Sequence, residues 1–81
     1  MVNKEIQKVY EIAKKIEYGT NFTSSVKHNG IFISINTGKN NNKNALMKIE
    51  QEVLKEFGNK VDTLITANNL MIKIGGIDYE L

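Results

Sequence analysis

Two short runs of this chain alternate between branched apolar residues and other residues. Residues 31–35 read IFISI, and residues 70–74 read LMIKI. Because successive side chains of a β-strand point to opposite faces, a period of two predicts strands with one buried face. A chain of 81 residues holds one hydrophobic core and no second domain. We therefore expect both buried faces to join the same core.

Each alternating run has a partner strand and a turn before it. The pair Asn29-Gly30 suits a type I′ turn, because both of its central residues need positive φ. A second hairpin is expected around Asn68-Asn69. In the first hairpin the predicted partners are His28 with Ile31, Val26 with Ile33, and Ser24 with Ile35. The predicted core faces hold Phe22, Val26, Ile31, Ile33 and Ile35 in the first hairpin, and Val61, Ile65, Leu70, Ile72 and Ile74 in the second.

A helix is predicted before each hairpin, from apolar residues spaced by three and four. The first helix covers Lys4 to about Tyr18, with Asn3 as its N-cap and Gly19 as the left-handed residue that ends it. The second is also stopped by a glycine, Gly58. The apolar stripes are Ile6, Val9, Ala13 and Ile16 in the first helix, and Leu46, Ile49, Val53 and Phe57 in the second.

The two halves of the chain resemble each other. Residues 17–19 read EYG and residues 56–58 read EFG, which is an offset of 56 − 17 = 39. We interpret this as a tandem α-β-β repeat, about 3–36 and 44–75, with a polar Asn-rich linker at 37–43. Independent convergence on one local pattern is the alternative. Either origin predicts a single α+β domain, 1–81, of order αββαββ, whose four-stranded antiparallel sheet carries both helices on one face.

Composition argues against most catalytic chemistry. The chain has no cysteine and one histidine, His28, which lies beside a predicted turn; a zinc site of the usual kinds needs more ligands. We predict no enzyme, catalytic residue, metal or cofactor. No apolar run approaches the length of a membrane span, and the charged N-terminal residues do not resemble a secretion signal. A cytoplasmic protein is expected.

Gly38-Lys39 lies in a loop between a predicted strand and helix, where backbone amides attract anions. A phosphate-binding P-loop would need another glycine five residues before this pair, but that position is Ile33. The segment is therefore predicted to be a linker. Weak phosphate or nucleic-acid contact by Lys39 and Lys43 is the alternative.

The sheet face opposite the predicted helices is the candidate binding surface. Its large apolar residues are Phe32, Leu64 and Met71, and they stand among Lys27 and Lys73. Exposed apolar patches tend to mark interfaces. Two alternatives stay open: the segment 77–81 covers this face, or each residue is an isolated exposed apolar group.

Two functions follow from this surface. The first is a protein-binding module that docks on a partner or on a second copy of itself, through the open face or an edge strand. Lysine, asparagine and isoleucine occur eleven times each, which indicates an AT-rich genome, so a phage- or plasmid-encoded inhibitor of a host defence protein is its specific version. The second is weak single-strand nucleic-acid binding through lysines. No arginine is present to read DNA bases bidentately, and a net charge of +2 is small for nucleic-acid binding.

Overall fold

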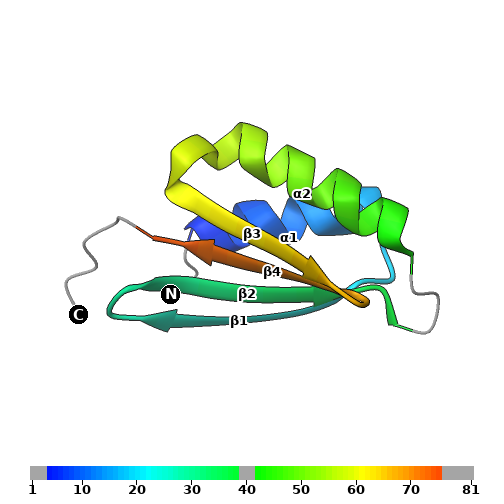
Figure 1. Ribbon diagram of the computed structural model, residues 1–81, viewed down its shortest axis with the longest axis horizontal. Coiled ribbons are helices and arrows are strands. Elements are labelled where there is room, and N and C mark those ends of the chain that lie inside the picture. The colour runs from blue at the N-terminus through cyan, green and yellow to red at the C-terminus, as the bar shows by residue number, and fades with distance from the viewer. Residues whose placement is uncertain (1–3, 39–41, 76–81) are drawn as a thin grey trace.

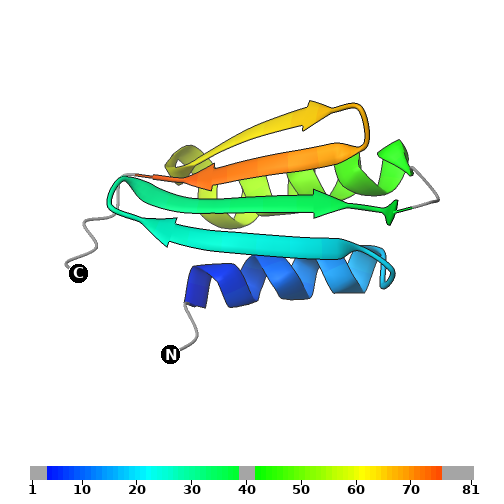
Figure 2. The same ribbon diagram turned by 90° about the horizontal axis from the view of Figure 1, so that it is seen from below.

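The computed structural model describes residues 4–38 and 42–75. Its strands form one antiparallel sheet in the order β1-β2-β4-β3, so β1 and β3 are the edges (Figure 2). The α+β class and the four-stranded antiparallel sheet are confirmed. The elements are α1 (Lys4–Ile16), β1 (Asn21–Lys27), β2 (Gly30–Asn36), α2 (Lys43–Phe57), the 3-10 turn η2 (Gly58–Lys60), β3 (Val61–Thr66) and β4 (Asn69–Ile74).

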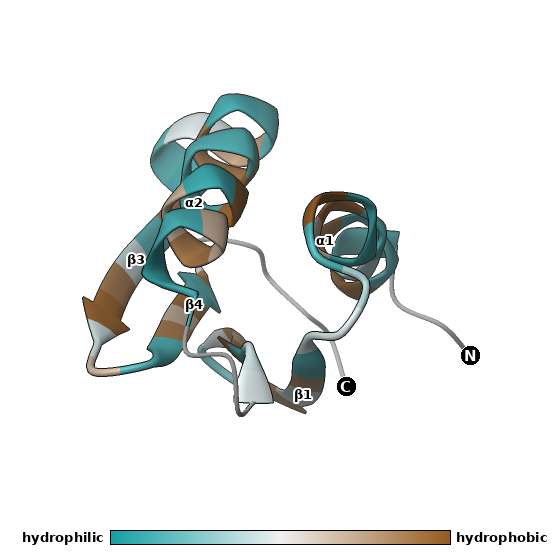
Figure 3. Cartoon of the chain, turned by 90° about the vertical axis from the view of Figure 1, so that its right-hand side faces the viewer, coloured by the Kyte–Doolittle hydropathy of each residue, from teal (hydrophilic) through white to brown (hydrophobic). Residues whose placement is uncertain are grey.

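Helices and strands form two layers, with the helices side by side (Figures 1 and 3). The core between them draws on both helices and on three strands. Its large, almost fully buried side chains are Val9, Ile31, Ile33, Ile35, Leu46, Ile49, Val53, Leu70, Ile72 and Ile74. In the described part of the chain, neither helix is long and apolar enough to cross a bilayer.

Contacts beyond the core attach each helix to the sheet. Tyr10 of α1 meets Phe22 of β1 edge to face, with ring centroids 5.3 Å apart. The Thr63 hydroxyl of β3 donates a hydrogen bond to the Glu50 carboxylate of α2 at 2.7 Å. The predicted core residue Val26 stays 42% exposed, because β1 is an edge strand and α1 is linked to it at Phe22, near the other end.

Both hairpin turns lie one residue earlier than predicted. Lys27 pairs with Gly30, and Val26 pairs with Ile31 rather than with Ile33, so the first turn is His28-Asn29. In the second hairpin Thr66 pairs with Asn69, which makes the turn Ala67-Asn68. The first register therefore differs from the predicted one by two residues. A shift of two preserves the alternation of faces, so the predicted core isoleucines are still buried.

Gly30 is the first residue of strand β2, where it lies very close to the backbone of β4. Its φ is +143°, and a Cβ at this position would lie 2.5 Å from the Ile74 carbonyl oxygen of β4. Only a residue without a side chain allows the two strands to approach this closely. The predicted role of Gly30 in a type I′ turn is wrong, because Gly30 pairs with Lys27 as the first residue of β2. A glycine is needed at this position for the close contact with β4.

The two helices end differently. Gly58 has φ +60° and its N–H donates to the Leu54 carbonyl, so the predicted glycine stop of α2 is confirmed. Helix α1 ends at Ile16, before Gly19, whose φ is not positive. The Lys14 ammonium donates to the carbonyls of Tyr18 at 3.2 Å and Thr20 at 2.7 Å, so a lysine of the last helical turn holds the segment that follows α1. The predicted N-cap Asn3 lies outside the described residues.

The described ends of the predicted linker are ordered by hydrogen bonds. Thr37 is buried, and its hydroxyl accepts from the Asn42 N–H at 2.7 Å. The Asn42 side chain accepts from the Ala45 N–H at 3.1 Å and thereby caps α2, which already includes Lys43. The connection is therefore shorter than residues 37–43.

Replacing this cap is expected to weaken the fold moderately. Asn42→Ala removes the acceptor for the Ala45 N–H and should lower the free energy of unfolding by about 1 kcal/mol, a fall in Tm of roughly 4–8 °C. Asn44→Ala is the matched control, because Asn44 is exposed in the same first turn and is not the cap. Thermal unfolding followed by circular dichroism measures both. Equal Tm values for the two variants would contradict the capping role.

Candidate functional site

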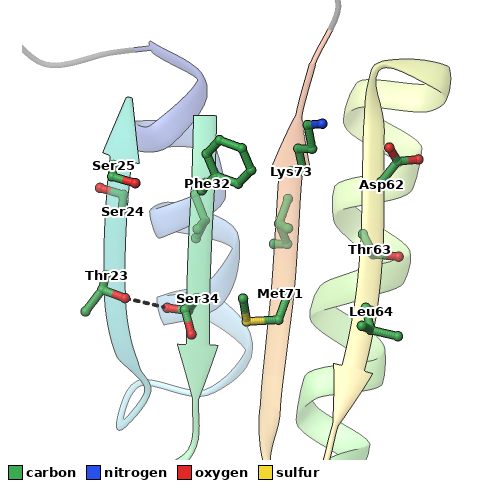
Figure 4. Close-up of a pocket in the computed structure, with 12 residues that line it drawn as sticks. Thr23, Ser24, Ser25, Phe32, Ser34, Asp62, Thr63, Leu64, Met71 and Lys73 are labelled. Atoms are coloured by element: carbon green, nitrogen blue, oxygen red, sulfur yellow. Dashed lines mark hydrogen bonds between the residues drawn. The ribbon is translucent and has the colours of Figure 1, made fainter. Parts of the chain in front are cut away.

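The strand register arranges one surface of the sheet in two rows that cross all four strands. We call this surface the Phe32 face; its side chains alternate with the buried ones (Figure 4). The first row is Ser25, Phe32, Lys73 and Asp62, and the second is Thr23, Ser34, Met71 and Leu64. Neighbouring rows are two residues apart along a strand, or about 7 Å.

Apolar surface is concentrated in the second row. Leu64 and Met71 are directly opposite each other on β3 and β4, and their side chains are 58% and 46% exposed. The eight residues of the two rows line a shallow hollow of about 440 Å³. The Phe32 face can therefore accommodate side chains of another molecule without enclosing a small ligand.

Phe32 of the first row lies beside two cations, Lys73 of the same row and Lys27, which is two residues beyond Ser25 on β1. The ammonium nitrogens of Lys27 and Lys73 lie 5.8 Å and 5.7 Å from the Phe32 ring centroid, within the distance of cation–π attraction. Because an ammonium has three donors and the ring engages only one side of it, both groups keep donors for an acceptor outside the chain.

Carboxylates of the described residues form no ion pair with these two lysines. Asp62 stands opposite Lys73 in the register but forms no ion pair with it. Between residues 4–38 and 42–75, the ion pairs are Lys8 with Glu56 and Lys55 with Glu52, which belong to the helices. Lys27, Lys73 and Asp62 together therefore leave one positive charge in excess around the Phe32 ring.

Five residues were predicted for partner binding. Phe32, Leu64, Met71 and Lys73 line the hollow, and Lys27 lies beside it, next to the Phe32 ring. Lys43 is exposed at the start of α2 and does not line the hollow. Lys39 lies outside the described residues. The segment 77–81, the alternative cover for this face, also lies outside them. Sequence reasoning missed Asp62, although its spacing of two residues from Leu64 assigns it to the same face.

The single histidine of the sequence does not line this hollow. His28 is exposed in the first turn. Within the described ranges, no three residues among His, Cys, Asp and Glu gather as ligands for a metal ion. What the Phe32 face offers chemically is apolar contact next to two cations.

No family model, curated protein or solved structure matches this chain. A functional assignment therefore depends on the residues of the Phe32 face and on their surroundings.

Proposed function

We propose that this chain is a small non-enzymatic protein-binding module that docks on its partner through the Phe32 face. The observation that carries this proposal is the adjacent pair Leu64 and Met71, which stays about half exposed beside an aromatic ring held under two lysines. When a partner removes clustered apolar side chains from water, the free energy of the system falls, and this favours binding. A central apolar contact with a charged rim is the usual composition of a protein interface.

The proposal includes a fold of two tandem α-β-β repeats with both helices on one face of the sheet. Its support is the β2–β4 register. Ile33 pairs with Ile72, and these positions differ by 72 − 33 = 39, which is the offset of the sequence repeat. Adding 39 to the first hairpin pair, Lys27 with Gly30, gives Thr66 with Asn69, which also pair. Phe32 and Met71 are then equivalent positions on the surface that the helices leave open.

The cellular setting of this module follows from composition. We place it in the cytoplasm as an inhibitor of a host protein, encoded by a phage or plasmid, because its residue usage indicates an AT-rich genome. A second copy of the chain is the other partner considered. Sizing by light scattering over a range of concentrations distinguishes a stable self-association from a monomer that needs a different partner.

Substituting the apolar residues of the Phe32 face is expected to abolish capture of a partner. Tagged wild-type protein and the double variant Phe32→Ser/Met71→Ser are incubated with lysate of a low-GC bacterium, with and without nuclease. The wild type should retain a protein in both lanes, and the double variant should lose it, because serine cannot supply the buried apolar contact.

Met47→Ser is the control for exposure alone, since Met47 is 50% exposed on α2, away from this face. It should capture the same protein as the wild type. Unchanged capture by the double variant would remove the Phe32 face from the binding surface.

Single-strand nucleic-acid binding is the second candidate, and the observation that favours it is the contact of two lysines, Lys27 and Lys73, with the Phe32 ring. Bases stack on aromatic rings, and phosphates bind lysines. Among the eight residues of the two rows, however, Phe32 is the one aromatic residue, and Leu64 and Met71 offer apolar contact instead of stacking. Loss of all captured protein on nuclease treatment, together with salt-sensitive binding of an oligothymidine probe, would favour this function over the first.

A further inference from the structure

We propose that the occupant of the Phe32 face is an acidic segment of a partner protein, in which a carboxylate stands next to a large apolar side chain. The carboxylate binds over Lys27 and Lys73, and the apolar side chain packs on Met71 and Leu64. This inference rests on the proposed function and adds to it the chemistry of the partner.

Charge complementarity selects the acidic group. The Lys27 and Lys73 ammonium groups share one ring and have no carboxylate partner within the described ranges. A carboxylate above this row meets two cations at once, and it accepts hydrogen bonds from both. Asp62 beside Lys73 disfavours a second acid at the β3 edge, so the carboxylate belongs over the Phe32 ring, which both ammonium groups approach.

Row spacing determines where the apolar group lies. The Met71–Leu64 pair is in the row next to Phe32 and Lys73, about 7 Å along the strands. In an extended segment this separation corresponds to residues i and i+2, and in a helix approximately to residues i and i+3 or i+4. The acid and the apolar residue of the partner are therefore close in its sequence.

On strands β1 and β2 the footprint ends after these two rows, because the next side chains, Asn21 and Asn36, are engaged internally. The Asn36 side-chain oxygen accepts from the Asn21 side chain at 2.9 Å and from the Gly38 N–H at 3.0 Å. An acceptor already engaged by two donors has little capacity for a third. The specificity of the face thus reduces to one acid and one large apolar side chain.

Available area favours a segment over a second copy of the chain. Four strands at about 4.8 Å spacing and six residues at about 3.3 Å give a sheet surface of roughly 300–400 Å². Stable interfaces between folded proteins bury about 800 Å² on each partner. A short peptide segment needs less contact area than a folded partner. Its side chains can also enter the hollow lined by the two rows, whereas the flat sheet of a second copy cannot.

Selection from a library of random 12-residue peptides displayed on phage tests this inference. Peptides enriched on the wild type should carry Asp or Glu two to four residues from a Leu, Ile, Met or Phe. On the double variant Lys27→Glu/Lys73→Glu the acid should be replaced by Lys or Arg, with the apolar residue retained. The wild-type consensus peptide should bind this variant roughly tenfold or more weakly, because two attractions become repulsions.

Lys15→Glu/Lys48→Glu is the matched control. It changes the net charge by the same amount at two exposed lysines of the helices, and should bind the consensus peptide as the wild type does. Circular dichroism verifies that each variant is folded. A consensus without an acid, an unchanged acid preference in the Lys27/Lys73 variant, or no enrichment at all would each overturn the proposal.

The remaining outcomes identify a different occupant, and each also overturns the proposal. Acid-dependent peptide binding that appears only after removal of residues 76–81 would assign the face to the chain's own C-terminal segment. Binding of an oligothymidine probe lost only in the Lys27/Lys73 variant would assign the first row to nucleic acid. Capture that is lost in Phe32→Ser/Met71→Ser but unchanged by the charge reversal would leave the proposed function intact and refute the acidic partner alone.

Discussion

Gly30→Ala is expected to lower the free energy of unfolding by about 2–4 kcal/mol. The new Cβ would lie 2.5 Å from the Ile74 carbonyl oxygen, which is backbone and moves only if strand β4 moves. The φ of +143° adds strain, because side chains of L-residues rarely adopt it. A domain of this size has roughly 4–12 kcal/mol of total stability, so the loss is a large fraction. Urea unfolding followed by far-ultraviolet circular dichroism measures this loss of stability.

Gly19→Ala is the matched control for that experiment. Nothing lies within 4 Å of a Cβ at Gly19, and its φ is not positive, so alanine should leave stability unchanged or raise it by about 0.4–1 kcal/mol. Gly30→Asn separates the strand role of Gly30 from a turn role. Asparagine is tolerated at positive φ in a type I′ turn, whereas here it should destabilise as much as alanine. A stable Gly30→Asn protein would argue against the close approach of β2 and β4.

Leu46→Ala is expected to cost about 2–5 kcal/mol, because it leaves a cavity in the centre of the core. Leu46 is fully buried on α2 and belongs to the cluster that joins both helices to the sheet. Its neighbour Met47 is 50% exposed on the same helix, so Met47→Ala should change stability by less than about 0.5 kcal/mol. Leucine, methionine and alanine are all good helix formers, and the comparison therefore isolates burial from helix propensity.

Urea midpoints of Leu46→Ala and Met47→Ala, compared at equal m-values, provide the measurement. A change in m in either variant would indicate an altered denatured or native state and would require calorimetry instead. Similar losses of stability in the two variants would contradict the orientation of α2. A much larger loss in Leu46→Ala would support an orientation in which Leu46 faces the core and Met47 faces solvent.

Turns were harder to predict than faces, and the two hairpins show why. A turn is chosen by a few residues, and Asn29-Gly30 was the better local signal than His28-Asn29. The contact that needs Gly30 in a strand is made with Ile74, 44 residues later in the chain (74 − 30), and no local pattern contains it. The same displacement in the second hairpin puts Ala67 at φ +46°, an unusual conformation for a residue with a side chain.

Exposure at the sheet edge also depended on neighbours distant in sequence. Val26 has the alternation of a core residue but remains 42% exposed, since β1 lies at the edge of the sheet. Strand order decides which strands become edges, and it results from the pairing of β2 with β4 across the two halves. Met71 and Leu64 belong to one hairpin, so the sequence could predict that they share a face. The proximity of Phe32 to Lys73 depends on the β2–β4 register, which the sequence did not predict.

The sequence by itself determined the helices, the strands and the face to which each strand residue points, because periods of 3.6 and 2 follow from local backbone geometry. It thereby also placed Phe32, Leu64 and Met71 on the face opposite the core, whereas the exposure of Val26 depended on strand order. Only the tertiary structure decided the strand order, the turn positions and the placement of two ammonium groups over one ring. The strand order, the position of Gly30 and the neighbourhood of Lys73 and Phe32 depend on contacts between β2 and β4, whose energies arise only when distant parts of the chain meet.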